Sequence, residues 1–129
     1  AAVKSAKANA KLHGFSKNIK VLYSNLFKNV PKIKFNVITF NPPFRNKKAS
    51  NVVERSQWDT NFATHRAFFK GVSRYLKPDG RIYIAQSSFG DKQEMLRLAK
   101  KHGFMSKLLD QKKKRGGGVF YVFLLTRET

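Results

Sequence analysis

The chain has 129 residues, of which 27 are Lys or Arg and 7 are Asp or Glu, so its formal net charge is +20. A surplus of this size attracts polyanions, which makes nucleic acid or the ribosome the expected partner. The 41% of apolar residues, with twelve Phe among them, can form a core and excludes a disordered chain. The absence of Cys excludes disulfides and Cys-based zinc sites or nucleophiles. No apolar run reaches the ~20 residues needed to cross a bilayer, and we expect a cytoplasmic protein.

The first half of the chain predicts a helix, two strands and a long loop. Small apolar residues recur at helical spacing near the start, which predicts an amphipathic helix that ends near Gly14. Apolar and β-branched runs predict strands over residues 19–23 and 35–40. The second strand ends at two prolines, which lack the N–H that a ladder needs. The polar segment that follows, residues 45–60, is long for a connection inside a domain, and such loops are often functional.

The second half of the chain predicts alternating helices and strands. The expected elements are a helix over residues 61–76, a strand over 81–87, a helix over 91–101, and two strands over 104–109 and 119–126. Thr60 or Asn61 is expected to cap the first of these helices. The last two strands flank a short basic, glycine-rich turn and should form an antiparallel hairpin. This alternation predicts a single α/β domain over residues 1–129, with helices on the faces of a sheet.

The sequence Asn41-Pro42-Pro43-Phe44 follows the strand over residues 35–40. Ligands of open α/β sheets bind at the carboxyl ends of strands. The Asn41 side-chain oxygen and the Pro42 carbonyl oxygen are acceptors that would orient a planar NH2 group, and Phe44 would stack on a planar ring. An isolated Asn-Pro-Pro would favour a rigid turn with a capping Asn. Here the apolar strand before it and the elements after it favour a binding site.

These four residues resemble motif IV of class I S-adenosyl-L-methionine (SAM)-dependent methyltransferases that modify exocyclic or amide nitrogens. This group includes the small-domain, HemK-like and N6-adenine methyltransferases. The likeness covers nearly the whole chain: Tyr75-Leu76-Lys77-Pro78-Asp79-Gly80-Arg81 resembles the turn before the family's fifth strand, and the last two strands resemble its reversed hairpin. The resemblance implies a Rossmann-like sheet, mostly parallel with a C-terminal antiparallel hairpin. It also implies that the sheet is incomplete at the N-terminus, where the family has a strand and a SAM-binding loop.

The resemblance implies roles for two sets of residues. Asn41 and Pro42 would hold the target nitrogen, Pro43 would stiffen the turn with Pro42, and Phe44 would flank the target ring or amide. Direct methyl transfer from SAM would then depend on orientation of the nitrogen at near-attack distance.

The cofactor residues implied by the resemblance lie earlier in the chain. Asn25 falls where the family usually has Asp near the SAM adenine, and Leu26 would be an apolar neighbour of that adenine. Because the family's first strand and loop are not in these residues, we expect residues 1–129 alone to bind SAM weakly or not at all.

Basic residues follow the motif and form the expected hairpin tip. The candidate nucleic-acid contacts are Arg45, Lys47, Lys48, Lys112, Lys113, Lys114 and Arg115. Such runs are as typical of a solvated basic surface as of a phosphate-binding one. Trp58 is expected either to cover the substrate or to anchor its loop on the core. Asp59 and His65 are expected to be exposed, His13 and His102 to end helices, and no metal site is expected because the His residues do not cluster.

Three functions are open at this point. The first is methylation of an RNA base, with ribosomal RNA placed before DNA. The second is methylation of a release-factor glutamine, which Phe44 slightly disfavours because that group has Tyr there. The third is a non-catalytic remnant that binds RNA or a partner chain.

Overall fold

The computed structural model describes residues 1–45, 47–51, 53–54 and 58–128. Backbone contacts divide the chain into two compact units, Ala1–Pro31 and Lys32–Thr129. The single domain expected over residues 1–129 stays a prediction. Within the described ranges, no helix is both long enough and apolar enough to span a membrane.

The first unit contains helix α1 (Ala2–Leu12), which confirms the helix expected there. The helix ends at His13, as expected, and Gly14 follows with a φ of +74°. The prediction of a strand over residues 19–23 is wrong, because these residues have an irregular backbone. A strand needs ladder hydrogen bonds to a neighbour, and the sheet of the described residues consists of four strands from later in the chain.

The second unit is built on this four-stranded sheet, in the order β1-β2-β4-β3. Its strands are β1 (Phe35–Phe40), β2 (Leu76–Ser87), β3 (Phe104–Lys113) and β4 (Val119–Arg127). Strand β2 pairs with β1 in parallel and with β4 in antiparallel orientation, and β3 pairs with β4 as the expected antiparallel hairpin. Two of these three pairings are antiparallel, so the described sheet is mixed rather than mostly parallel, and the α/β class is confirmed.

The turn expected at residues 76–80 lies inside β2. Phe35 pairs with Leu76 and Val37 already pairs with Arg81, so residues 77–80 bulge out of the ladder. Bulges of this kind bend a strand and increase its twist.

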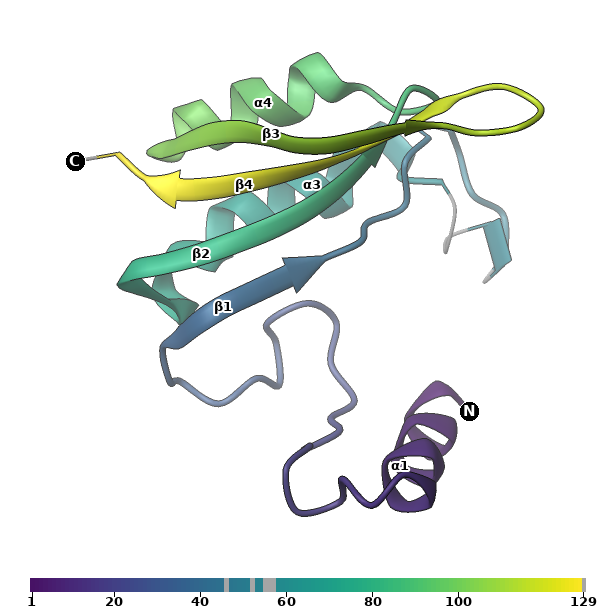
Figure 1. Cartoon of the computed structure of the whole chain (residues 1–129), viewed down its shortest axis with the longest axis vertical. Helices are drawn as coiled ribbons and strands as arrows, with labels where there is room; N and C mark the ends of the chain where they lie inside the picture. The colour runs from purple at the N-terminus through teal and green to yellow at the C-terminus, as the bar shows by residue number, and fades with distance from the viewer. Residues whose placement is uncertain (46, 52, 55–57, 129) are drawn as a thin grey trace. The chain divides into compact units, whose positions relative to one another are not determined.

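Two helices pack against the same face of the sheet: α3 (Ala63–Gly71), flanked by the short 3-10 helices η1 (Thr60–Phe62) and η2 (Val72–Tyr75), and α4 (Lys92–Lys101) (Figure 1). The Asp91 carboxylate caps α4 by accepting the N–H of Glu94 at 3.0 Å, and α4 ends at His102, as expected. Apolar residues of these helices and of the start of β2 are buried: Phe62, Phe69, Val72, Leu76, Met95, Leu98 and Ala99. Each large apolar side chain buried in this way contributes about 1.5–3 kcal/mol.

The carboxyl end of β1 and the tip between β3 and β4 lie at the same end of the sheet (Figure 1). The parallel pairing of β1 with β2 puts their carboxyl ends side by side, and the antiparallel pairing places Phe120 opposite Ser87. Segments that are far apart in the sequence therefore meet at the end of β1.

Candidate functional site

A pocket of about 470 Å³ lies at the carboxyl ends of β1 and β2. We call it the motif pocket, and its described lining consists of Asn41, Pro42, Pro43, Phe44, Arg45, Trp58, Phe89 and Phe120. The four residues predicted as the catalytic motif therefore line one pocket. Three further aromatic side chains reach it from other segments of the chain.

The motif presents its Asn side chain freely. Asn41 is exposed, and within the described residues no hydrogen bond engages its side-chain amide. Pro42 is buried behind it, and the ring of Phe44 meets that of Phe120 edge to face, with centroids 5.9 Å apart. The turn is thus packed into the protein while the Asn41 amide stays available for a ligand.

A cation lies over the ring of each aromatic residue in the described lining except Phe44. The Arg45 guanidinium lies 4.7 Å from the centroid of Phe89, Lys47 Nζ lies 5.4 Å from that of Trp58, and Lys114 Nζ lies 5.4 Å from that of Phe120. Such contacts are worth about 0.5–1 kcal/mol at exposed sites. The rim of the motif pocket therefore combines flat apolar faces with positive charge.

The structure separates the predicted basic residues into two groups. It brings Arg45, Lys47 and Lys114 to the motif pocket through their aromatic partners. The others are exposed on the loop and the hairpin: Lys48, Lys112, Lys113 and Arg115.

The described parts of the loop over residues 45–60 fold back on the motif. Arg45 and Trp58 form a parallel bridge, and the Arg45 carbonyl accepts the N–H groups of Lys47 and Asp59. Thr60 Oγ1 donates to the Lys47 carbonyl at 2.9 Å and accepts the Ala49 N–H at 3.0 Å. Trp58 is half-buried, so it is both tied to Arg45 and part of the pocket wall.

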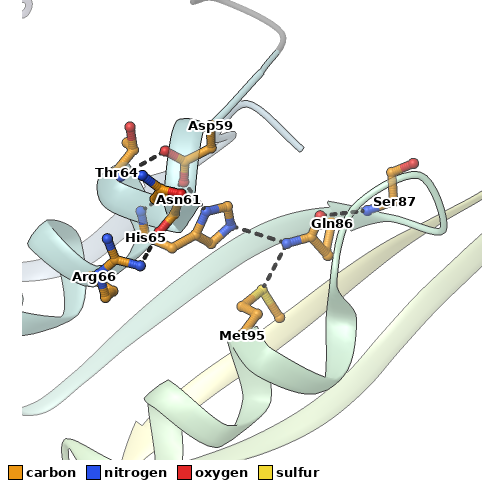
Figure 2. Close-up of polar contacts among 8 residues, drawn as sticks. All are labelled: Asp59, Asn61, Thr64, His65, Arg66, Gln86, Ser87 and Met95. Carbon is orange, nitrogen blue, oxygen red and sulfur yellow. Dashed lines mark hydrogen bonds and ion pairs between the residues drawn. The ribbon is translucent and has the colours of Figure 1, made fainter. Parts of the chain in front are cut away.

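The expectation that Asp59 and His65 are exposed is wrong. Their exposed fractions are 2% and 0%, and Asp59 lies 2.7 Å from His65 Nδ1 (Figure 2). The Asp59 carboxylate also accepts the N–H groups of Thr64 at 2.8 Å and His65 at 3.1 Å. Asp59, rather than Thr60 or Asn61, therefore caps α3.

The cap forms because the chain reverses just before α3. Asn61 and Phe62 both have left-handed backbone, with φ of 55° and 57°, which brings Asp59 back over the first N–H groups of the helix. Phe62 then stacks on the His65 ring, with centroids 3.8 Å apart. Side chains rarely favour this conformation, and no pattern in the sequence indicates it.

Gln86, at the end of β2, completes the buried network (Figure 2). Its Nε2 lies 3.0 Å from His65 Nε2 and 3.6 Å from the Met95 sulfur, and its Oε1 accepts the Ser87 N–H at 3.0 Å. An amide NH2 only donates, so His65 Nε2 is the acceptor and the ring proton is on Nδ1, facing Asp59.

Asp59 is ionised within this network. Burial acts to raise the pKa of Asp59, but hydrogen bonds from the His65 ring and from the N–H groups of Thr64 and His65 outweigh it, so the pKa of this carboxyl lies below its ordinary value. No buried polar side-chain atom in the described part of the chain lacks a partner.

Asn25 and Leu26, the predicted cofactor residues, lie in the first unit. Ser24 Oγ donates to the Leu26 carbonyl and accepts the Asn29 N–H, both at 2.8 Å, and Leu26 has a φ of 53°. Asn25 is exposed on this tight turn and Leu26 is half-buried. Their role at SAM stays a prediction. No cluster of three or more metal-ligating side chains occurs among the residues that the structure describes.

The model of the methyltransferase small-domain family matches residues 1–114. The chain belongs to the methyltransferase small-domain family. A putative protein N5-glutamine methyltransferase of Methanocaldococcus jannaschii is 36% identical over 112 residues, which cover 80% of this chain and 54% of the relative. A bifunctional methyltransferase of Rickettsia typhi is 28% identical over 116 residues, which cover 80% of this chain and 22% of the relative. The small-domain chain thus spans about half of the first relative and about a fifth of the second.

A solved structure supports the same fold. The ribosomal protein L11 methylase of Lactobacillus delbrueckii subsp. bulgaricus superposes with a TM-score of 0.64 at 15% identity, over 98% of this chain and 52% of that one. The predicted Rossmann-like fold is confirmed, and so is the predicted resemblance of this chain to small-domain methyltransferases.

Sequence reasoning missed two walls of the motif pocket. Phe89 follows the end of β2 by two residues, so the rule that ligands bind at the carboxyl ends of strands could have found it. Phe120 depends on the β2–β4 register, which the sequence does not state.

Proposed function

We propose that this small-domain chain holds the methyl acceptor of a SAM-dependent methyltransferase, and that the acceptor is a planar nitrogen of an RNA base. The observation that carries the proposal is the motif pocket, where the free Asn41 amide lies among aromatic rings with cations over them. A base taken out of its stack needs acceptors for its amino group, rings to stack on and cations near its phosphates. The net charge of +20 favours the same class of substrate. We expect the protein to bind this substrate in the cytoplasm.

The residues of the chain divide between the two reactants. SAM, when bound, supplies a methyl group activated by a positively charged sulfur. Asn25 would hold its adenine, because an exposed side-chain amide offers both a donor and an acceptor, and Leu26 would supply apolar surface beside it.

At the acceptor, the Asn41 side-chain oxygen and the Pro42 carbonyl oxygen would accept the two N–H bonds of the target amino group. They fix its plane, and they stabilise the positive charge that develops on the nitrogen. None of the described lining residues is a carboxylate or an imidazole, so orientation rather than proton abstraction would provide the rate.

Substitution of Asn41 tests this function. We expect Asn41→Ala in the full-length protein to reduce transfer of tritiated methyl groups by about 10²-fold or more. The unfolding midpoint should not move, because the side chain is exposed and makes no described hydrogen bond. Asn36→Ala changes another exposed Asn of the same segment and should leave transfer intact. Full activity of Asn41→Ala would remove Asn41 from the reaction.

A release-factor glutamine is the second candidate acceptor. It is favoured by the 36% identity to a putative protein N5-glutamine methyltransferase, and its side-chain amide is also a planar nitrogen. Incubation with tritiated SAM and either total RNA or release factor separates the two, since the label enters only one of them. Binding of RNA with no label in either substrate would instead favour a non-catalytic RNA-binding chain.

A further inference from the structure

Three polar residues form a buried network beside the motif pocket without belonging to its described lining. Asp59, His65 and Gln86 are 2%, 0% and 0% exposed. Buried polar groups of this kind are costly unless every partner is in place, so a satisfied network fixes the segments that it joins. Here it joins the segment before α3 to the end of β2.

On one side, the network holds the loop that carries the wall of the pocket. The Asp59 N–H is donated to the Arg45 carbonyl, and Arg45 is bridged to Trp58, the residue before Asp59. Both Arg45 and Trp58 line the motif pocket. A shift of the Asp59 carboxylate would therefore move two lining residues.

On the other side, the network reaches Phe44 through Gly90. A Cβ added to Gly90 would collide with Gln86 Oε1 and with the Phe44 carbonyl oxygen. The Gln86 amide and the Phe44 carbonyl therefore both lie against the side of Gly90 that carries no side chain, which brings the end of the network close to the motif.

His65 is the connection between the two sides. Its Nδ1 is 2.7 Å from Asp59 and its Nε2 is 3.0 Å from Gln86 (Figure 2). The ring is held flat against Phe62, with an angle of 8° between the planes. A rigid ring with a hydrogen bond at each end sets a fixed distance between its partners.

We propose that His65 is a positioning residue that joins the loop behind Trp58 to the end of β2 and so fixes the walls of the motif pocket around the methyl acceptor. The inference rests on the proposed function, in which the motif pocket holds the acceptor. His65 is fully buried and lies outside the described lining of the pocket; its Nδ1 faces Asp59 and its Nε2 faces Gln86. Misplacement of an acceptor by about 1 Å costs on the order of 10²-fold in rate.

Two substitutions break the connection at different points. His65→Asn retains an N–H donor for Asp59 but is too short to reach Gln86. Gln86→Met retains the Asp59–His65 pair and a side chain of similar length, but it removes the donor to His65. Glu94→Gln serves as the control, because it breaks the exposed ion pair with Arg97 on α4.

Trp58 is the single Trp of the chain, so its fluorescence reports on the pocket wall without an activity assay. In both network variants, we expect acrylamide to quench Trp58 more strongly than in the wild type and its emission to shift to longer wavelength. In the full-length protein, kcat for methyl transfer should fall by about 10–100-fold, while KM for RNA changes little because the exposed hairpin cations Lys112, Lys113 and Arg115 lie outside the network. Glu94→Gln should match the wild type in every measurement.

Unchanged Trp58 quenching in variants that still unfold cooperatively would overturn the inference. Loss of cooperative unfolding in Gln86→Met would also overturn it, since the network would then act on stability alone. If the fluorescence responds as expected but the wild-type protein labels neither RNA nor release factor, the proposed function falls and the connection through His65 stands.

Discussion

At the scale of single residues, a buried carboxylate is stable only when hydrogen bonds replace the water that it loses. Asp59 meets this condition with the N–H groups of Thr64 and His65 and the Nδ1 proton of His65. Removal of such an acceptor leaves its donors unpaired inside the protein, and that costs more than the bonds themselves contributed. Asp59 is therefore both a helix cap and a source of pH-dependent stability.

We expect Asp59→Asn to lower the free energy of unfolding by about 1–3 kcal/mol at pH 7, because its NH2 group faces other donors. The lowered pKa of Asp59 means that the carboxylate stabilises the fold above its ordinary pKa, and that this contribution is lost as pH falls through the lower folded-state value. The gap between wild type and variant should therefore narrow below about pH 4. Urea unfolding at pH 7 and pH 3 measures it.

Asp110→Asn removes an exposed carboxyl of β3 and should change the unfolding free energy little at either pH. A gap for Asp59→Asn that is equal at pH 7 and pH 3 would contradict the assignment of an ionised, hydrogen-bonded Asp59.

At the scale of elements, the connection between β2 and α4 packs against the motif that lines the motif pocket. Gly90 lies in this connection, and its missing side chain leaves room for the Phe44 carbonyl and the Gln86 amide. Gly90→Ala should lower the unfolding free energy by about 1–3 kcal/mol, because the carbonyl is backbone and must shift. Thermal unfolding followed by circular dichroism measures the change, with Gln93→Ala on the exposed side of α4 as the control. If Gly90→Ala unfolds with the same free energy as wild type, the close approach of Gly90 to the Phe44 carbonyl does not constrain the motif.

The elements that could be predicted from the sequence are those whose signals are local. Helix α4 carries its own cap, Asp91, and is followed by Gly103 with a φ of +87°, and the motif at Asn41 can be recognised from its own four residues. Residues 19–23 have the composition of a strand but no neighbour in the described sheet. Their strand propensity therefore predicted a strand that does not form. The contact of His65 with Gln86 spans 21 positions and depends on two left-handed residues, and no sequence rule places it.

At the scale of the whole molecule, the charge of +20 determines how strongly the affinity for a polyanion depends on salt. Each phosphate contact releases counterions, so affinity falls with salt. Lys112 and Lys113 are exposed beside the hairpin tip, and Lys100 and Lys101 are exposed at the end of α4. The two pairs allow a comparison at identical net charge.

We expect Lys112→Gln with Lys113→Gln to reduce the slope of log affinity against log salt for single-stranded RNA by about 0.7 for each phosphate that is no longer neutralised, or about 1.4 for two phosphates. Lys100→Gln with Lys101→Gln should leave the slope nearly unchanged. Fluorescence anisotropy with labelled RNA at several salt concentrations measures both. Equal slopes for the two double variants would mean that RNA does not distinguish the hairpin from the rest of the basic surface.

The edge-to-face contact between Phe44 and Phe120 has a consequence for synthesis of the protein. The motif leaves the ribosome long before Phe120 does, and the β2–β4 register is what places Phe120 against it. Contacts between such distant residues form late in folding. A nascent chain therefore carries the motif before the Phe120 wall of its pocket, and that wall is added only once β4 is in place.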